Sequence, residues 1–205
     1  QMMTAFVQSI LQKVSYTITS DSNDFNIQGI LTATNVRFTG STEIFVKNGG
    51  NMDLTNCPLV SGNFVAYEVG SEGSISGSTF STAKLNYYTP GLSITGSTFT
   101  GDDPITTYPS LVGALPGNTF SGSGPNIHIN GGTTNTNVSW TALGSATQYV
   151  IDNTVTVAPA ITLSMSEGIT IKTNNSYDLN VQGTVIATGV QFTGSTEIFV
   201  KSSGR

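Results

Sequence analysis

Short segments rich in β-branched and aromatic residues recur along the chain, with their first residues 20 to 22 positions apart. The series runs through Ile44–Val46, Phe64–Tyr67, Leu85–Tyr88, Ile105–Tyr108 and Ile127–Ile129. A second set, which includes Ser74-Ile75 and Leu92–Ile94, falls between them. Gly, Asn and Pro separate the segments. Each period therefore predicts two or three short strands joined by turns.

A tetrapeptide of the form Asn/Gly-x-x-large apolar repeats in step with these segments. Six copies begin 19 to 21 positions apart, and a seventh follows later in the sequence. Their first residues are Asn35, Asn56, Gly77, Gly96, Gly117, Asn137 and Gly189. Asn and Gly tolerate a positive φ angle, so the first place predicts a tight corner. The apolar fourth place predicts an inward ladder that includes Phe80, Phe99, Phe120 and Trp140.

A period near 20 residues with several strands predicts an all-β fold. The favoured form is a β-solenoid in which each period is one coil of about 20 residues. Equivalent residues of neighbouring coils would stack about 4.8 Å apart along the axis. The alternative is an antiparallel sandwich with regular hairpins. Strands that alternate in direction do not readily keep six tetrapeptides in phase, which favours the solenoid.

A longer repeat overlies the short one. Asp24–Gly50 and Asp178–Gly204 match at 18 of 27 positions, 154 residues apart, and share the identical decapeptide FTGSTEIFVK. This indicates a tandem duplication within one solenoid domain that spans residues 1–205. We expect Phe38 and Phe192, which begin the two decapeptides, to occupy equivalent places in the same aromatic ladder.

The amino-acid sequences of the repeats resemble those of a known family. ISGSTFS, ITGSTFTG and LPGNTFSG, with the run Thr154–Gly189, resemble the repeats of right-handed parallel β-helices of the pectin-lyase-like type in extracellular and surface proteins. The resemblance covers nearly the whole chain and implies the fold. Lyases, hydrolases, adhesins, phage spikes and surface-layer proteins share that fold, so the resemblance does not choose an activity.

The first residues of the chain allow two interpretations. Val7, Ile10, Leu11 and Val14 have helical spacing, and a short helix that caps the open end of a solenoid is physically sensible. The 154-residue repeat instead aligns this stretch with Ala158–Glu167, which has the pattern of a strand and a turn. Both interpretations stay open on the sequence alone.

Composition and charge exclude several partners. Only 9% of the residues are charged, and Thr, Ser, Gly and Asn fill the deficit with 31, 24, 23 and 17 copies. Seven scattered Lys and Arg and a net charge of −5 argue against a nucleic-acid partner. No apolar run reaches the length of a membrane span. Cys57 is the only cysteine, so no internal disulfide forms. This composition fits an extracellular or cell-surface protein.

Candidate catalytic residues are sparse. The resemblance implies that a hydrolase of this fold would carry an Asn-Thr-Asp motif, an Asp pair, a Gly-His-Gly and an Arg-Ile-Lys. Only the pair Asp102-Asp103 is present, and it precedes Pro104, which favours a solvated turn over a weak calcium site. Glycoside hydrolysis needs two carboxylates that face each other across a bond. We therefore expect no enzyme, no catalytic residues, no metal site and no cofactor.

The direction of two further side chains can be predicted, one from alternation along a strand and one from its position in the repeated tetrapeptide. His128 lies between Ile127 and Ile129, so it should point outward if both isoleucines point inward, as a surface residue rather than a metal ligand. Cys57 occupies the slot that Val36 fills in another copy of the tetrapeptide, which predicts a buried thiol that acts as a small hydrophobe.

Thr and Ser flank the apolar residue of the tetrapeptide and would form two outward rows on consecutive coils. The pairs are Thr79/Ser81, Thr98/Thr100, Thr119/Ser121 and Ser139/Thr141. A flat Thr-x-Thr face resembles ice-binding proteins, but Thr and Ser are also ordinary surface residues of strands. Arg37, Pro58 and Gln191 interrupt the rows in other coils, which favours the ordinary interpretation.

These patterns favour a non-enzymatic extracellular β-solenoid with a structural or adhesive role. No C-terminal cap is visible in the sequence, so we expect end-to-end stacking with other copies into a filament, fibre or sheath, or a place in a longer tandem-repeat surface protein. The alternative is a carbohydrate-binding or polysaccharide-cleaving β-helix with a cell-surface polysaccharide as partner. Its sugar-stacking side chains would be Tyr87, Tyr88, Tyr108 and Tyr149. An ice-binding solenoid is the third candidate.

Overall fold

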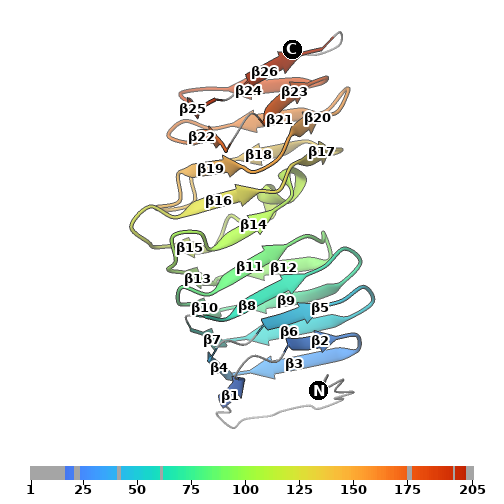
Figure 1. Cartoon of the computed structure of the whole chain (residues 1–205), viewed down its shortest axis with the longest axis vertical. Coiled ribbons are helices and arrows are strands. Elements are labelled where there is room, and N and C mark those ends of the chain that lie inside the picture. Colours follow the sequence, from blue (N-terminus) through green and yellow to red (C-terminus); the bar gives the residue numbers. More distant parts are fainter. Residues whose placement is uncertain are drawn as a thin grey trace.

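The computed structural model describes residues 17–20, 24–40, 43–60, 62–174, 177–195 and 197–201. They form a parallel β-solenoid of about eight coils, with about 21 residues in a coil (Figure 1). The predicted parallel β-helix is thus confirmed, and the antiparallel sandwich is wrong. The predicted N-terminal capping helix falls on residues 1–16, which lie outside the described residues.

One sheet runs along the whole stack. Its nine strands, all parallel, are β2 (Asp24–Ile27), β5 (Glu43–Val46), β8 (Phe64–Tyr67), β11 (Lys84–Tyr87), β14 (Ile105–Thr107), β16 (Asn126–Ile129), β19 (Gln148–Ile151), β22 (Thr170–Thr173) and β25 (Gln191–Gly194). Partners in neighbouring strands are 19 to 22 residues apart, as in the pairs Asp24–Glu43 and Asn126–Gln148. The periodic segments of the sequence are therefore the strands of this sheet.

The other two faces each change sheet about halfway along the stack. The first half has a four-stranded sheet of β3 (Ile30–Thr34), β6 (Asn51–Thr55), β9 (Glu72–Ser76) and β12 (Leu92–Thr95). It also has a six-stranded sheet of β1 (Thr17–Ser20), β4 (Arg37–Gly40), β7 (Pro58–Leu59), β10 (Thr79–Phe80), β13 (Thr98–Phe99) and β15 (Thr119–Phe120).

The second half replaces both of these sheets. One new sheet holds β17 (Gly132–Thr134), β20 (Val155–Val157), β23 (Asp178–Val181) and β26 (Glu197–Val200), and the other holds β18 (Val138–Trp140), β21 (Thr162–Met165) and β24 (Thr184–Ala187). A short 3-10 helix, η1 (Pro109–Ala114), stands in the chain between β14 and β15, where earlier coils have a strand of the four-stranded sheet. Only the nine-stranded sheet continues through this junction.

The core contains the predicted aromatic ladder along the six-stranded sheet. Phe80, Phe99 and Phe120 are register partners with at most 2% of their surface exposed, and their ring centroids lie 4.7 and 5.1 Å apart in stacked orientation. Trp140 is buried, but its predicted place in this ladder is wrong. It lies in β18 and stacks on Tyr149, with 5.3 Å between the ring centroids. The six-stranded sheet ends at β15, and β18 belongs to the sheet that succeeds it, so Trp140 has no register partner in the ladder.

The corners before the ladder residues have the predicted backbone at most copies. The φ angles are 57° at Asn35, 52° at Asn56, and 58° and 59° at Gly77 and Gly96. Asn137 departs from the pattern, because its backbone does not adopt a positive φ. Its side-chain Oδ1 instead accepts a hydrogen bond of 2.8 Å from the backbone N–H of Thr162.

The second copy of the decapeptide does not occupy the place of the first. Phe38 lies in β4 and is the partner of Leu59 in the six-stranded sheet. Phe192 lies in β25 and is the partner of Ile171 in the nine-stranded sheet. The expectation that both rings enter one ladder is therefore wrong, because 154 residues do not make a whole number of coils.

We predict that Phe99→Ala lowers the free energy of unfolding by about 3 to 5 kcal/mol, since the ring is fully buried between two others. Chemical denaturation followed by circular dichroism measures this loss. Thr98→Ala, on the outward side of the same strand, is the matched control and should change stability by less than about 0.5 kcal/mol. Equal effects of the two substitutions would contradict the ladder.

Candidate functional site

The outer face of the nine-stranded sheet carries a cluster of polar side chains, which we call the polar cluster: Asp103, Asn126, His128, Asp152 and Asn174. His128 lies in β16 between Ile127 and Ile129, and both isoleucines are completely buried. Its outward orientation, predicted from this alternation, is confirmed. The imidazole is half-buried, with 22% of its side chain exposed.

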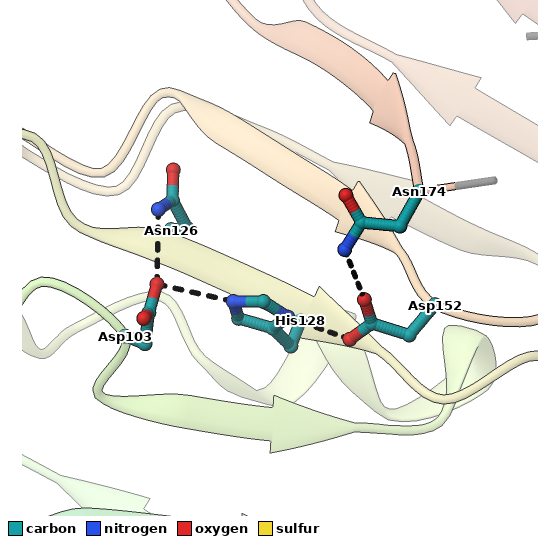
Figure 2. A network of polar contacts seen from close by, with 5 residues as sticks. All are labelled: Asp103, Asn126, His128, Asp152 and Asn174. Carbon is teal, nitrogen blue, oxygen red and sulfur yellow. Dashed lines mark hydrogen bonds and ion pairs between the residues drawn. The ribbon is translucent and has the colours of Figure 1, made fainter. Parts of the chain in front are cut away.

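The imidazole of His128 bridges two carboxylates from coils on either side (Figure 2). Nδ1 lies 2.6 Å from Oδ2 of Asp152, which directly follows β19, and Nε2 lies 3.1 Å from Oδ1 of Asp103, in the loop before β14. Asn126 donates from Nδ2 to Asp103 Oδ1 at 2.9 Å, and Asn174 donates from Nδ2 to Asp152 Oδ1 at 2.7 Å. The cluster therefore connects four successive coils.

The number of N–H groups on the ring decides how many of the two carboxylate contacts are hydrogen bonds. A neutral imidazole has one N–H and can donate to only one of its two neighbours. The contacts to Asp103 and Asp152 can both be hydrogen bonds at the same time only when the ring carries two N–H groups. The ring is then charged and forms an ion pair on each side.

Asp103 is stabilised in its ionised form. The hydrogen bond from Asn126 is the main cause that lowers the pKa of this carboxyl group below its ordinary value, with partial burial acting against it and with His128 and Lys84 adding to the lowering. Because 41% of the Asp103 side chain is exposed, the associated contribution to stability is small.

A pair of tyrosine rings lies on the same face, at the ends of the strands. Tyr88 follows β11 and Tyr108 follows β14, with ring centroids 5.0 Å apart and planes inclined by 37°. Burial raises the pKa of Tyr88, and the nearby Tyr108 and Asp152 raise it further. This tyrosine pair therefore lies beside the polar cluster. Both rings are half-buried rather than fully exposed.

Two of the predicted sugar-stacking tyrosines are inside the molecule instead. Tyr87 and Tyr149 expose 1% and 0% of their surface, so the prediction that they are exposed is wrong. Tyr149 donates a hydrogen bond of 2.6 Å from its hydroxyl to the backbone oxygen of Thr141. Both side chains point into the solenoid because they alternate with outward residues in β11 and β19.

The other sequence candidates lie apart from the cluster. Cys57 is completely buried, as predicted, and burial raises the pKa of its thiol. Asp102 is exposed and accepts a hydrogen bond from Ser123, so only the second residue of the Asp pair joins the cluster. The row of Thr79, Thr98 and Thr119 is in register.

Ser139 lies in β18, outside the six-stranded sheet that carries the threonine row. The flat face of a Thr-rich solenoid is therefore shorter than the sequence rows indicated.

The cluster was not predicted, although its spacing was available in the sequence. Asp103, His128 and Asp152 follow one another at 25 and 24 residues, slightly more than the length of one coil. The two aspartates lie just outside strands, where loop length decides which coil a side chain reaches. The alternation of residues in β16 predicted that His128 points outward. Its two partners become visible only when the strands are assembled into the sheet.

The arrangement does not match the usual geometry for cleaving a glycosidic bond. That reaction needs two carboxyl groups that face a scissile bond between them. Here Asp103 and Asp152 flank one imidazole, and each also accepts a hydrogen bond from an asparagine. Among the described residues, no three His, Cys, Asp or Glu side chains are placed to hold a metal ion.

Comparison of the chain with protein-family models, with curated proteins and with solved structures gives no match. Within the described part of the chain, no helix has the length and apolar character that crossing a membrane requires.

We predict that Asp103→Asn lowers stability near neutral pH by less than about 1 kcal/mol, the scale of an exposed ion pair. A carboxyl group whose pKa is lowered by folding contributes above its unfolded value and loses that contribution as the pH falls through its folded value. The difference between the variant and the native chain should therefore vanish in acid. Urea unfolding at several pH values measures it.

Asp24→Asn is the control for this titration, because Asp24 is exposed in β2 at the far end of the sheet. A pH-independent loss of stability in Asp103→Asn, or the same pH profile in both variants, would contradict the role of the carboxylate in the cluster.

Proposed function

We propose that this chain is a non-enzymatic, extracellular structural β-solenoid whose stack is extended by further coils of the same kind. The observation that carries the proposal is the different burial of identical residues. Ile44 and Val46 expose 1% and 0% of their surface, whereas Ile198 and Val200, at the same places of the repeated decapeptide, expose 46% and 62%.

The difference arises from what lies on the next coil. Ile44 and Val46 are register partners of Val65 and Tyr67 in β8, which cover them. β26, which carries Ile198 and Val200, is the last strand of its sheet, and β24 and β25 are the last strands of theirs. In the described structure, the outer edges of these three strands have no strand partner.

An open edge of this kind favours association. Unpaired backbone groups and exposed apolar residues on a terminal coil form a template for another strand, which most proteins block. Ile186 and Phe192 add to the apolar end, with 52% and 37% of their surface exposed. A contact between one end of a solenoid and the other end of a second copy does not close on itself, so it builds a filament, fibre or sheath.

The remaining surface supports an extracellular structural role. Charged residues make up only 9% of the chain, and small polar residues cover the outward positions of the strands. The carboxylates of the polar cluster are engaged with His128 and two asparagines, so they serve the stack by linking coils. A structural or adhesive solenoid requires no more chemistry than this.

We predict that the native chain associates with increasing concentration and that the double variant Ile198→Lys/Val200→Lys does not. Two positive charges on the terminal coil would oppose burial of that end, because an unpaired buried charge is strongly unfavourable. Sedimentation velocity over a concentration series, with electron microscopy of the same samples, measures the change.

The matched control is Ser93→Lys/Thr95→Lys, which adds the same charge to outward positions in β12 in the middle of the stack. It should associate as the native chain does. Compact single particles of the native chain at high concentration would contradict the proposal, as would equal association of the two double variants.

The tyrosine pair favours a second candidate function, the binding of a carbohydrate chain along the nine-stranded sheet. Aromatic faces with a few polar groups nearby are usual in ligand sites, and Tyr88 and Tyr108 lie beside Asp152. The half-buried rings offer only part of their faces, so we rank this function below the structural one.

We predict that, if this function holds, Tyr108→Ala weakens binding to a glycan found on an array by about tenfold or more, which corresponds to roughly 1.4 kcal/mol. Tyr177→Ala, a half-buried tyrosine outside the pair, should leave the affinity unchanged. Absence of any glycan binding by the native chain removes this candidate and leaves the structural function untouched.

A further inference from the structure

The two copies of the repeat use different faces of the solenoid. In the first copy, β2, β3, β4 and β5 lie in the nine-stranded, four-stranded, six-stranded and nine-stranded sheets in turn. In the second copy, β23 and β26 share the sheet that succeeds the four-stranded one, β24 lies in the sheet of β18, and β25 lies in the nine-stranded sheet. Each strand of the second copy therefore lies on the face of the coil that follows the face of its counterpart in the first copy.

The repeat is therefore seven and one third coils long. Three elements make one coil, and 22 elements, with η1 counted, lead from β2 to β23. Within each copy the local structure is nevertheless the same. Asp24 is the partner of Glu43, and Asp178 is the partner of Glu197, in the same register.

The nine-stranded sheet shifts sideways along the stack. Sheets twist with a fixed hand, and the nine-stranded sheet moves from the right of the view at β2 to the left at β25 (Figure 1). As a result β4 and β25 both lie on the left, with β2 and β23 to the right of them (Figure 1). The equivalent strands β4 and β25 thus lie on the same side of this view although they belong to different sheets (Figure 1).

We infer that the open terminal coil accepts a second copy of this repeat joined in tandem from Asn51 onward, with β24, β25 and β26 pairing with β6, β7 and β8 of that copy. The tandem form is required because in a separate chain these three strands are already paired with β3, β4 and β5. This inference rests on the proposed function and specifies its partner and register. It follows from the first copy, in which β3, β4 and β5 pair with these same strands.

The contacts of the first copy show what the incoming strands would bring. Leu59 packs on Phe38 there, so the incoming Leu59 would cover Phe192. Val65 and Tyr67 of the incoming copy would cover Ile198 and Val200, as they do their equivalents. Each exposed apolar residue of the decapeptide gains the neighbour that its identical counterpart already has.

The lysine at the end of the decapeptide would also gain an oppositely charged partner. Lys47 forms an ion pair with Glu68 on the next coil, and its ammonium group lies over the ring of Phe45. Lys201 occupies the equivalent place and lies over the ring of Phe199, 5.2 Å from its centroid. The incoming Glu68 would therefore meet Lys201. Successive units would rise by seven and one third coils, or about 35 Å at about 4.8 Å per coil.

The test is an extended chain in which residues 51–205 follow directly after Gly204 of the full sequence. Hydrogen exchange of the internal segment 184–201 is measured by mass spectrometry. Ile186→Val in the terminal copy gives its peptide a different mass. The internal segment should exchange about tenfold or more slowly than in the native chain, and the maximum dimension from small-angle scattering should grow by about 35 Å.

A phase control separates this inference from the proposed function. In a second extended chain, residues 51–57 of the added unit are deleted, which removes β6 and shifts every later strand by one face. Protection only in the first extended chain supports the inference. Equal protection in both overturns the one-third-coil register and leaves coil stacking in place. Protection in neither overturns both the inferred partner and the stacking on which it rests.

Discussion

Stacking of one coil on the next is the interaction on which the rest of this structure depends. Almost every strand pairs with residues about 21 positions before and after it, so no coil completes its own hydrogen bonds or buries its own apolar side chains. The ladder of Phe80, Phe99 and Phe120 exists only because three coils supply one ring each. The same dependence leaves β24, β25 and β26 with one strand partner each in the described structure.

The periodicity of the sequence was sufficient to predict the fold, because a coil of nearly constant length repeats its corners and apolar residues at the same interval. It failed where the coil path changes. Trp140 and Asn137 follow η1, and there the ladder positions pass to another sheet. Phe192 was assigned to the wrong face for a related reason, since identical sequence does not ensure identical phase when the repeat is not a whole number of coils.

The polar cluster illustrates the limit for surface sites. Alternation with Ile127 and Ile129 predicted the direction of His128, which is a local property of one strand. Its partners Asp103 and Asp152 lie in loops one coil away on each side, and the lengths of those loops decide whether the side chains meet. A local pattern in the sequence contains the first kind of information and not the second.

The position of the cluster gives it a structural meaning. It connects β14, β16, β19 and β22. This span includes the coils of β14 and β16, between which both other faces change sheet and, among the described strands, the nine-stranded sheet alone is continuous. Trp140 acts at the same junction from within, because its Nε1–H donates a hydrogen bond of 3.1 Å to the backbone oxygen of Pro109 in η1. Polar bridges outside and an aromatic anchor inside thus hold together the place where the stack has the fewest strand pairs. A histidine between two carboxylates thus links successive coils at this junction.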